Sequence, residues 1–226
     1  MNNLRKSALL RWNKKLKEDI ARIPRDKKSM LKKVALCGFL AGDGSVQVRK
    51  GRKGDNYYHY QLDFFPDDEQ MLNSYLIFIQ DIYKLKPFVT KRDNVYNARL
   101  SQKFIVLDLL RFCKFGVYKW GFPNKLFKTK IAKILWLKAF FSAEAYVGKK
   151  VIKIQSVNIR SIKKVMKLLS ELKIKSNYYE YQSKNNKHSK VGMIFINDRK
   201  SRVIYYNKIG FWHNRKMTCL KESLGL

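Results

Sequence analysis

Two segments of the chain carry a carboxylate in a setting where it could do chemistry. The segment LCGFLAGDG, residues 36–44, contains Asp43, and the segment LKAFFSAEA, residues 137–145, contains Glu144. In both, a run of small and apolar residues typical of a buried helix ends on the acid, immediately before a hairpin-like stretch. Matching acids at the ends of matching helices predict that the two carboxylates act together.

Small residues recur four apart in both segments, which places them on one side of each helix. Such a side lets two helix backbones approach closely, so we expect the two helices to cross along it. The crossing would bring Asp43 and Glu144 together at one edge of the interface. The expected interface residues are Gly38, Gly42, Ala139 and Ala143.

Two neighbouring carboxylates repel each other and raise each other's pKa unless a cation lies between them. Oxygen ligands with phosphate nearby favour Mg²⁺. The sequence therefore predicts a shared metal site at Asp43 and Glu144, with Gly42 and Ala143 beside the acids as further candidate ligands.

The overall charge indicates the partner. The chain has 226 residues, 49 Lys and Arg against 17 Asp and Glu, and a net charge of +32. Such an excess is costly through self-repulsion unless a polyanion offsets it, so we expect nucleic acid. A ribosomal-type basic protein would explain the charge but not the duplicated acids. A membrane-surface protein would instead show short basic tails or amphipathic helices.

Other features exclude several classes. The three cysteines have no CxxC spacing, which argues against a disulfide framework and a zinc knuckle. No uninterrupted apolar stretch reaches the roughly 18 residues of a membrane span, and no apolar signal core opens the chain. We expect no membrane partner and an intracellular location, in a prokaryotic cytoplasm or an organelle interior.

Hydrophobic periodicity predicts one order of elements twice, which indicates an internal duplication. The first half reads helix 30–44, strands 44–50 and 57–64, helix 67–83, strands 86–92 and 95–101, and helix 102–115. The second half reads helix 129–145, a hairpin over 147–157, helix 158–173, strands 176–182 and 191–197, and helix 198–209. The predicted units are a basic helical extension (1–29), a first half (30–120), a linker (121–128) and a second half (129–226).

The two acid segments and this order of elements resemble the LAGLIDADG homing endonucleases in their single-chain, two-motif form, over roughly residues 30–215. The resemblance implies an α/β (α+β) fold: two pseudo-symmetric αββαββα halves forming a saddle-shaped antiparallel sheet surface, with two central motif helices. The second motif departs from the pattern, because Ala139 and Ala145 stand where glycine is usual and Ser142 where aspartate is common.

The resemblance also implies a function. It implies a site-specific endonuclease that hydrolyses one phosphodiester bond per strand of double-stranded DNA at a long asymmetric site. Its metal would be Mg²⁺, with Mn²⁺ as a substitute and Ca²⁺ binding without cleavage. An intron-encoded or free-standing monomer is expected. The alternative is a non-cleaving binding module on the same scaffold, either a maturase that binds intron RNA or a DNA-binding regulator.

Family members commonly carry a lysine near the fourth strand of each half. Lys103 matches that place, and Lys200 is its looser counterpart, so both are candidate catalytic residues that would stabilise charge on the phosphate. Members also carry a polar side chain at the end of the second strand. The corresponding places here hold Phe65-Pro66 and Gln155-Ser156, and the first pair departs from that pattern.

The strands are expected to carry recognition, since alternate side chains on one face of a sheet can enter the major groove. The candidate strand residues are Gln47, Arg49, Tyr58, Tyr60, Arg99, Lys153, Gln155, Tyr179 and Tyr181. Basic loop residues would meet phosphates. They are Arg52, Lys53, Lys150, Lys184 and Lys187.

Overall fold

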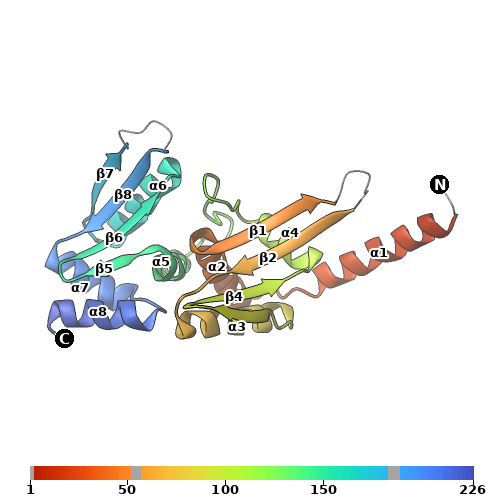
Figure 1. Ribbon diagram of the computed structural model, residues 1–226, viewed down its shortest axis with the longest axis horizontal. Coiled ribbons are helices and arrows are strands. Elements are labelled where there is room, and N and C mark those ends of the chain that lie inside the picture. Colours follow the sequence, from red (N-terminus) through yellow and green to blue (C-terminus); the bar gives the residue numbers. More distant parts are fainter. Residues whose placement is uncertain (1–2, 52–56, 183–188) are drawn as a thin grey trace.

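The computed structural model describes residues 3–51, 57–182 and 189–226 (Figure 1). The N-terminal extension is α1 (Asn3–Ala21). The first half contains, in order, α2 (Lys27–Gly42), β1 (Gly44–Lys50), β2 (Tyr58–Phe64), α3 (Glu69–Tyr83), β3 (Phe88–Arg92), β4 (Val95–Leu100) and α4 (Lys103–Leu110). The second half contains, in order, α5 (Lys130–Glu144), β5 (Tyr146–Gly148), β6 (Val151–Ser156), α6 (Ile159–Glu171), β7 (Asn177–Tyr181), β8 (Val191–Ile196), α7 (Arg199–Lys208) and α8 (Asn214–Leu224).

The predicted fold class is confirmed. Within the described ranges, the two halves form four-stranded antiparallel sheets of the same order, β1-β2-β4-β3 and β5-β6-β8-β7. Equivalent glycines after α4 and α7, Gly116 and Gly210, both have positive φ, which glycine adopts without steric cost. The sheets stand on either side of the central helices α2 and α5 (Figure 1).

Side-chain caps fix where most of the helices begin. A carboxylate, amide or hydroxyl oxygen just before the helix accepts a hydrogen bond from a backbone N–H three residues on, which satisfies one otherwise unpaired donor. The residues that do so are Asp26, Asp68, Thr129, Asn158 and Asp198. Because Asp26 caps α2, the helix begins at Lys27, three residues before the predicted start at Met30.

The helices α2 and α5 cross in unusually close contact. A Cβ placed on Gly38 would lie 2.6 Å from the Trp136 carbonyl oxygen and 2.7 Å from the Ala139 Cβ. A Cβ on Gly42 would lie 2.5 Å from the Ala143 Cβ. The glycines of α2 therefore leave the space that the alanine methyl groups of α5 occupy.

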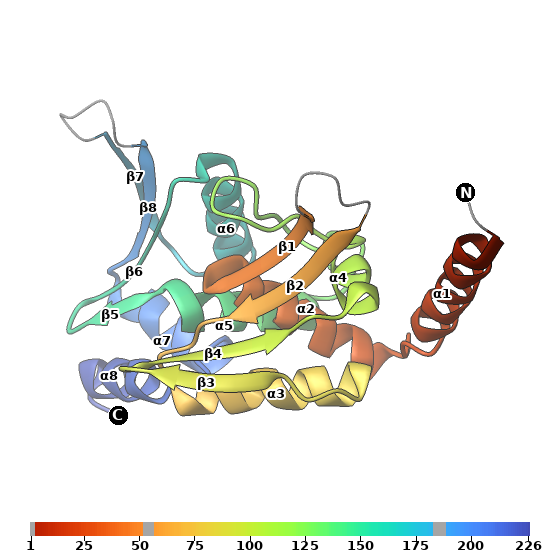
Figure 2. The ribbon, with the colours of Figure 1, turned by 45° about the vertical axis from the view of Figure 1, so that its right-hand side comes forward.

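The C-terminal helix α8 was not predicted from the sequence as an element of its own. It packs against β5 and α7, and in Figure 2 it runs along the same side of the molecule as α3. The segment that leads into it inserts Trp212 beside Phe39 and Phe78 of the first half. The second half thus ends with a helix that ties the two halves together.

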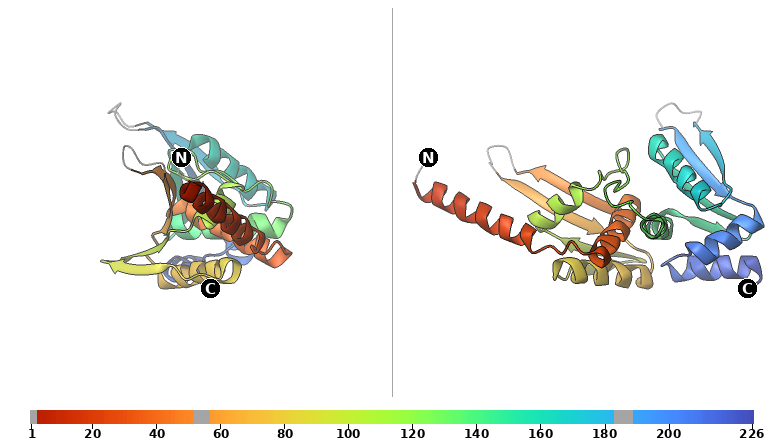
Figure 3. Two further views of the ribbon diagram at one scale, coloured as in Figure 1. Left: turned by 90° about the vertical axis from the view of Figure 1, so that its right-hand side faces the viewer. Right: turned by 180° about the vertical axis from the view of Figure 1, so that it is seen from behind.

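None of the helices in the described part of the chain is long and apolar enough to cross a membrane. The predicted phosphate contacts Arg52, Lys53, Lys184 and Lys187 lie outside the described residues. The N-terminal helix α1 contacts α4 and projects away from the body of the protein (Figure 3, right).

Gly38→Ala should destabilise the protein by roughly 1–3 kcal/mol or more, because its methyl group would overlap the backbone of α5. Helix propensity alone predicts the opposite sign, a gain of about 1 kcal/mol. The matched control is Gly121→Ala, where a Cβ meets nothing within 4 Å. Urea unfolding should separate the two variants, and equal stabilities would contradict the close crossing.

Candidate metal centre and nucleic-acid interface

The two motif acids meet at the end of the helix crossing. Asp43 caps the C-terminus of α2, and its carbonyl oxygen accepts a hydrogen bond from the backbone N–H of Phe65 at 2.9 Å. Glu144 is the last residue of α5, and its Cγ lies 3.2 Å from the position that a Cβ on Gly42 would take. Each half therefore contributes one carboxylate to the same place.

Burial disfavours the ionised form of both carboxyl groups and raises the pKa of each. Loss of solvation raises the pKa of Asp43 to about 6. Loss of solvation, followed by the charge of Asp43, raises the pKa of Glu144 to about 7. Neither shift would be expected for an exposed turn residue, and the repulsion that raises the pKa of Glu144 comes from the neighbouring Asp43.

Lys216, a residue of α8, contacts the last turn of α5 next to this pair of acids. The Nζ of Lys216 donates to the carbonyl oxygens of Ser142 at 2.6 Å and Ala143 at 2.7 Å, in the last turn of α5. Its charge lowers the pKa of both Asp43 and Glu144, while burial lowers the pKa of Lys216 itself. The Ala143 carbonyl, a predicted metal ligand, is thus already bonded to an ammonium group.

A histidine bridge from the second half reaches the loop after β2. The Nε2 of His213 lies 3.2 Å from Asp67, and its Nδ1 lies 3.3 Å from Asp68. Asp68 also accepts a hydrogen bond from the backbone N–H of Asn214 at 3.1 Å. Asp67 follows Phe65-Pro66 directly and raises the pKa of Asp43. Sequence reasoning missed His213, Asp67 and Lys216, because nothing in their spacing connects them with the motifs.

The donor set of the acid pair fits a divalent cation. A cation between the carboxylates would favour the ionised form that burial and repulsion disfavour. In the described ranges, no group of three or more His, Cys, Asp and Glu side chains is placed to hold a metal ion. Mg²⁺ commonly keeps several waters and binds one or two carboxylates together with substrate phosphates, which matches Asp43 and Glu144 alone.

Two of the three departures in the second motif have structural explanations. Ala139 fills space that Gly38 leaves open, so alanine replaces glycine without separating the helices. Ser142 is fully buried, donates to the Lys138 carbonyl at 2.7 Å and accepts from the backbone N–H of Trp212 at 2.7 Å. The serine therefore fixes the segment that leads into α8.

Of the two predicted catalytic lysines, Lys103 lies away from the acids. Lys103 begins α4, and its Nζ lies 5.3 Å from the ring centroid of Tyr60. Tyr60 pairs with Val48, four residues along β1 from Gly44, which is roughly 13 Å at 3.3 Å per residue. Lys200 is exposed near the start of α7. The structure therefore does not bring Lys103 to the acid pair.

The open face of the first sheet is polar over β1, β2 and β4, with the exposed Phe88 on its β3 edge. Leu62, Phe64 and Ala98 face the core, so residues of the opposite parity face outward. The outward residues include the predicted Gln47, Arg49 and Arg99, with His59, Gln61 and Asn97 in addition. Arg99 is anchored there, because its Nε lies 2.7 Å from Asp63.

Two predicted readers of the first half are corrected. Tyr58 and Tyr60 share the parity of Leu62 and therefore lie on the face directed toward the helices, where Tyr60 packs against the core. Large side chains occur at both parities of β2, so alternation did not distinguish its faces.

The open face of the second sheet is aromatic. Ile152, Ile154 and Ile194 face the core, which turns the opposite parity outward. All four predicted strand residues of this half lie on the open face, accompanied by Tyr146, Met193 and Phe195: they are Lys153, Gln155, Tyr179 and Tyr181. Lys150 is exposed in the turn between β5 and β6. The two halves thus present different chemistry on equivalent faces.

Two sheets of one order, related about a close helix crossing with an acid from each helix, agree with the fold that the resemblance to the two-motif LAGLIDADG proteins implies. Comparison of sequences supports this: the profile of the LAGLIDADG-like domain family matches residues 132–210. No curated protein sequence gives a significant match.

Solved structures confirm the resemblance of fold. Mesophilic variants of the homing endonuclease I-DmoI match with a TM-score of 0.64 and 17% identity, over 80% of this chain and 91% of theirs. I-DmoI in complex with DNA and Mn gives 0.64 and 17%, over 80% and 97%. Full-length DUF199/WhiA from Thermatoga maritima gives 0.53 and 12%, over 93% and 65%. The predicted resemblance to the single-chain LAGLIDADG fold is confirmed.

The raised acid pKa values predict how the stability of the metal-free protein depends on pH. Glu144 has a pKa of about 7 when folded against an ordinary 4.5, so the folded state binds its proton more tightly. The free energy of unfolding should therefore rise as pH falls from about 7 to 4.5. Glu144→Gln should be more stable than the parent at pH 8, and the difference should shrink near pH 5.

Chemical denaturation across this pH range measures the difference. The exposed Glu222→Gln serves as the control and should show no such dependence. A gap between parent and Glu144→Gln that stays constant from pH 5 to pH 8 would refute the buried acid pair.

Proposed function

We propose that this chain is a site-specific double-stranded DNA endonuclease that hydrolyses one phosphodiester bond per strand, with a divalent metal held by Asp43 and Glu144. The observation that carries the proposal is the meeting of two coupled carboxylates, one from each half, at the crossing of α2 and α5. The net charge of +32 and the DNA complex of I-DmoI support duplex DNA as the substrate.

The residues of the chain would bind the metal and orient the DNA, and would not themselves attack the phosphate. Asp43 and Glu144 would hold the metal in ionised form, and Lys216 would fix the last turn of α5 on which Glu144 stands. When bound, a divalent ion lowers the pKa of water and stabilises the leaving oxygen. The open sheet faces would set the register of the duplex, so that one phosphate of each strand lies at the acids.

The metal proposed is Mg²⁺, with Mn²⁺ as a substitute and Ca²⁺ binding without supporting cleavage. I-DmoI has been solved with DNA and Mn and with DNA and Ca, which supports a divalent site in this fold. A monomer suffices, because one chain supplies both acids and both sheets. An intron-encoded protein acting inside a prokaryote or an organelle is the proposed setting.

The second candidate function is binding without cleavage, to intron RNA as a maturase or to DNA as a regulator. It is favoured by the placement of Lys103 away from the acids and by the aromatic open face of the second sheet. Both functions use the same basic scaffold, so the test lies in strand cleavage.

Asp43→Asn and Glu144→Gln should retain duplex binding but reduce cleavage by roughly a hundredfold or more. Mutation of a residue that only hydrogen-bonds to a metal ligand already costs about 10- to 100-fold, so loss of a ligand itself should cost at least as much. A plasmid library with random target sites, incubated with protein and Mg²⁺, identifies a cut site, and variant rates are then measured on it. Asp81→Asn, which removes the exposed partner of Lys32, should cut like the parent.

The products of these variants separate two arrangements of the metal. Loss of both cuts in either variant indicates a shared central ion, whereas nicking of one strand indicates an ion for each acid. Variants that cut as fast as the parent would exclude the acid pair, and a parent that cuts no bound site would establish the binding function instead.

Duplex affinity should fall by about 10³ or more between 50 and 200 mM salt, if six or more phosphates are neutralised. Arg49→Ala, on the open face of the first sheet, should reduce the slope of log affinity against log salt by about one. Lys167→Ala, on the exposed side of α6, is the matched control and should leave the slope unchanged. Fluorescence anisotropy gives both slopes, and equal changes would argue against the open face as the duplex surface.

A further inference from the structure

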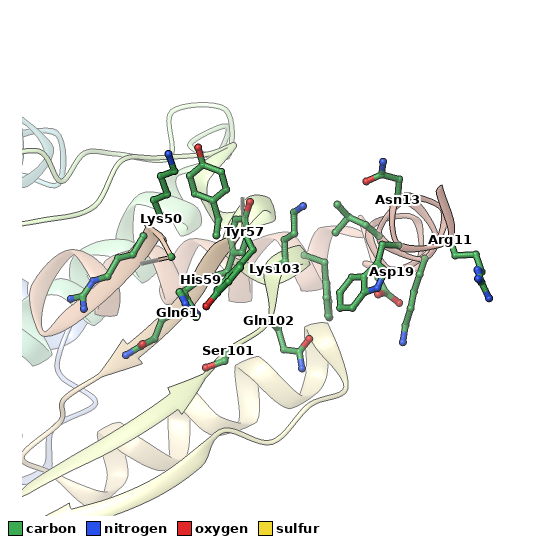
Figure 4. A pocket seen from close by; sticks show the side chains of 18 residues that line it. Arg11, Asn13, Asp19, Lys50, Tyr57, His59, Gln61, Ser101, Gln102 and Lys103 are labelled. Carbon is green, nitrogen blue, oxygen red and sulfur yellow. The ribbon is translucent and has the colours of Figure 1, made fainter. Parts of the chain in front are cut away.

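A groove of about 1320 Å³ separates α1 from the first half (Figure 4). One wall is α1. The other wall is formed by the end of β1, the start of β2 and the segment 101–104 that leads into α4. Lys103 stands between the hairpin and α1 in this view. The groove lies at the far end of β2 from Asp43 and plays no part in the proposed metal site.

The charge of the groove favours a polyanion. Asp19 is the one acid among the described lining residues, whereas five are basic: Arg11, Lys15, Arg49, Lys50 and Lys103. Like charges this dense repel one another unless a phosphate chain lies between them. Arg49, His59 and Gln61 line the groove and also face outward from the first sheet, so the groove is continuous with that face.

The aromatic residues that line the groove further restrict the class of ligand that it can bind. Five aromatic residues line the groove: Trp12, Tyr57, Tyr58, Tyr60 and Phe104. Trp12 is 73% exposed and Tyr58 is 55% exposed, and in the described part of the chain neither ring contacts another ring. An exposed ring next to cations stacks on a nucleobase, but a duplex hides the faces of its bases. The lining therefore suits an unpaired strand.

We propose that this groove binds a short unpaired stretch of a nucleic-acid strand, with bases stacked on Trp12 and Tyr58 and phosphates beside Lys15, Lys50 and Lys103. Lys103 then acts in strand binding. The groove adds a second nucleic-acid site to the open sheet faces, and it is independent of cleavage.

Anisotropy with the full chain and labelled single strands of mixed sequence tests the proposal, in DNA and RNA arms beside a duplex of the same sequence. Trp12→Ala should weaken single-strand binding at least about fivefold, since stacking contributes ~1–3 kcal/mol per base. Trp12→Tyr should restore most of it. Lys15→Ala should weaken binding more than Lys14→Ala, because both carry one charge on α1 but only Lys15 lines the groove.

Duplex binding should change little in these variants, and circular dichroism should show an unchanged fold because Trp12 is exposed. A stronger effect in the RNA or the DNA arm identifies the source of the strand, and either supports the proposal. Equal losses in Lys14→Ala and Lys15→Ala, an unaffected Trp12→Ala, or a loss confined to the duplex would overturn it. Absence of cleavage by the parent would contradict the proposed nuclease but not this site.

Discussion

The close crossing of α2 and α5 is the contact on which the rest of the structure depends. Gly38 and Gly42 leave room for the methyl groups of Ala139 and Ala143. The two helices lie so close that a Cβ added to either glycine would overlap atoms of α5. This approach fixes the separation of Asp43 and Glu144, and it sets the two sheets on opposite sides of one axis. Larger side chains at the crossing would push the helices apart and would displace both the acids and the sheet faces.

Groups from distant parts of the chain set the electrostatic environment of the acid pair. Burial disfavours the ionised carboxyl groups, and Lys216 of α8 partly offsets that cost by its charge. The same helix begins at His213, which bridges to the loop after β2 through Asp67 and Asp68. The second half thereby supports the acid of the first half. A bound cation would offset the remaining cost, so metal affinity and stability should be coupled.

Local pattern predicts the elements that local physics determines. The motif helices, their terminal acids and the repeated order of strands follow from small-residue spacing and from periods of 3.6 and 2. The predicted strand residues of the second half all lie on the open face of its sheet, where isoleucines occupy inward positions of β6 and β8. In β2, by contrast, Tyr58 and Tyr60 alternate with His59 and Gln61, and composition does not decide which set faces the core. Lys103 was placed by its distance from β4, but β4 runs away from the acid pair, so the lysine that follows it lies beside Tyr60. Lys216 is one basic residue among 49 and is identified only by tertiary contact.

The most direct test is to locate a metal by anomalous scattering in crystals of the protein soaked with Mn²⁺. We expect a manganese peak in contact with the carboxylates of both Asp43 and Glu144, at the end of the α2–α5 crossing, and no peak there in crystals of Asp43→Asn. Crystals that take up manganese only elsewhere, or in which the two carboxylates lie too far apart to share an ion, would contradict a metal centre built by the helix crossing.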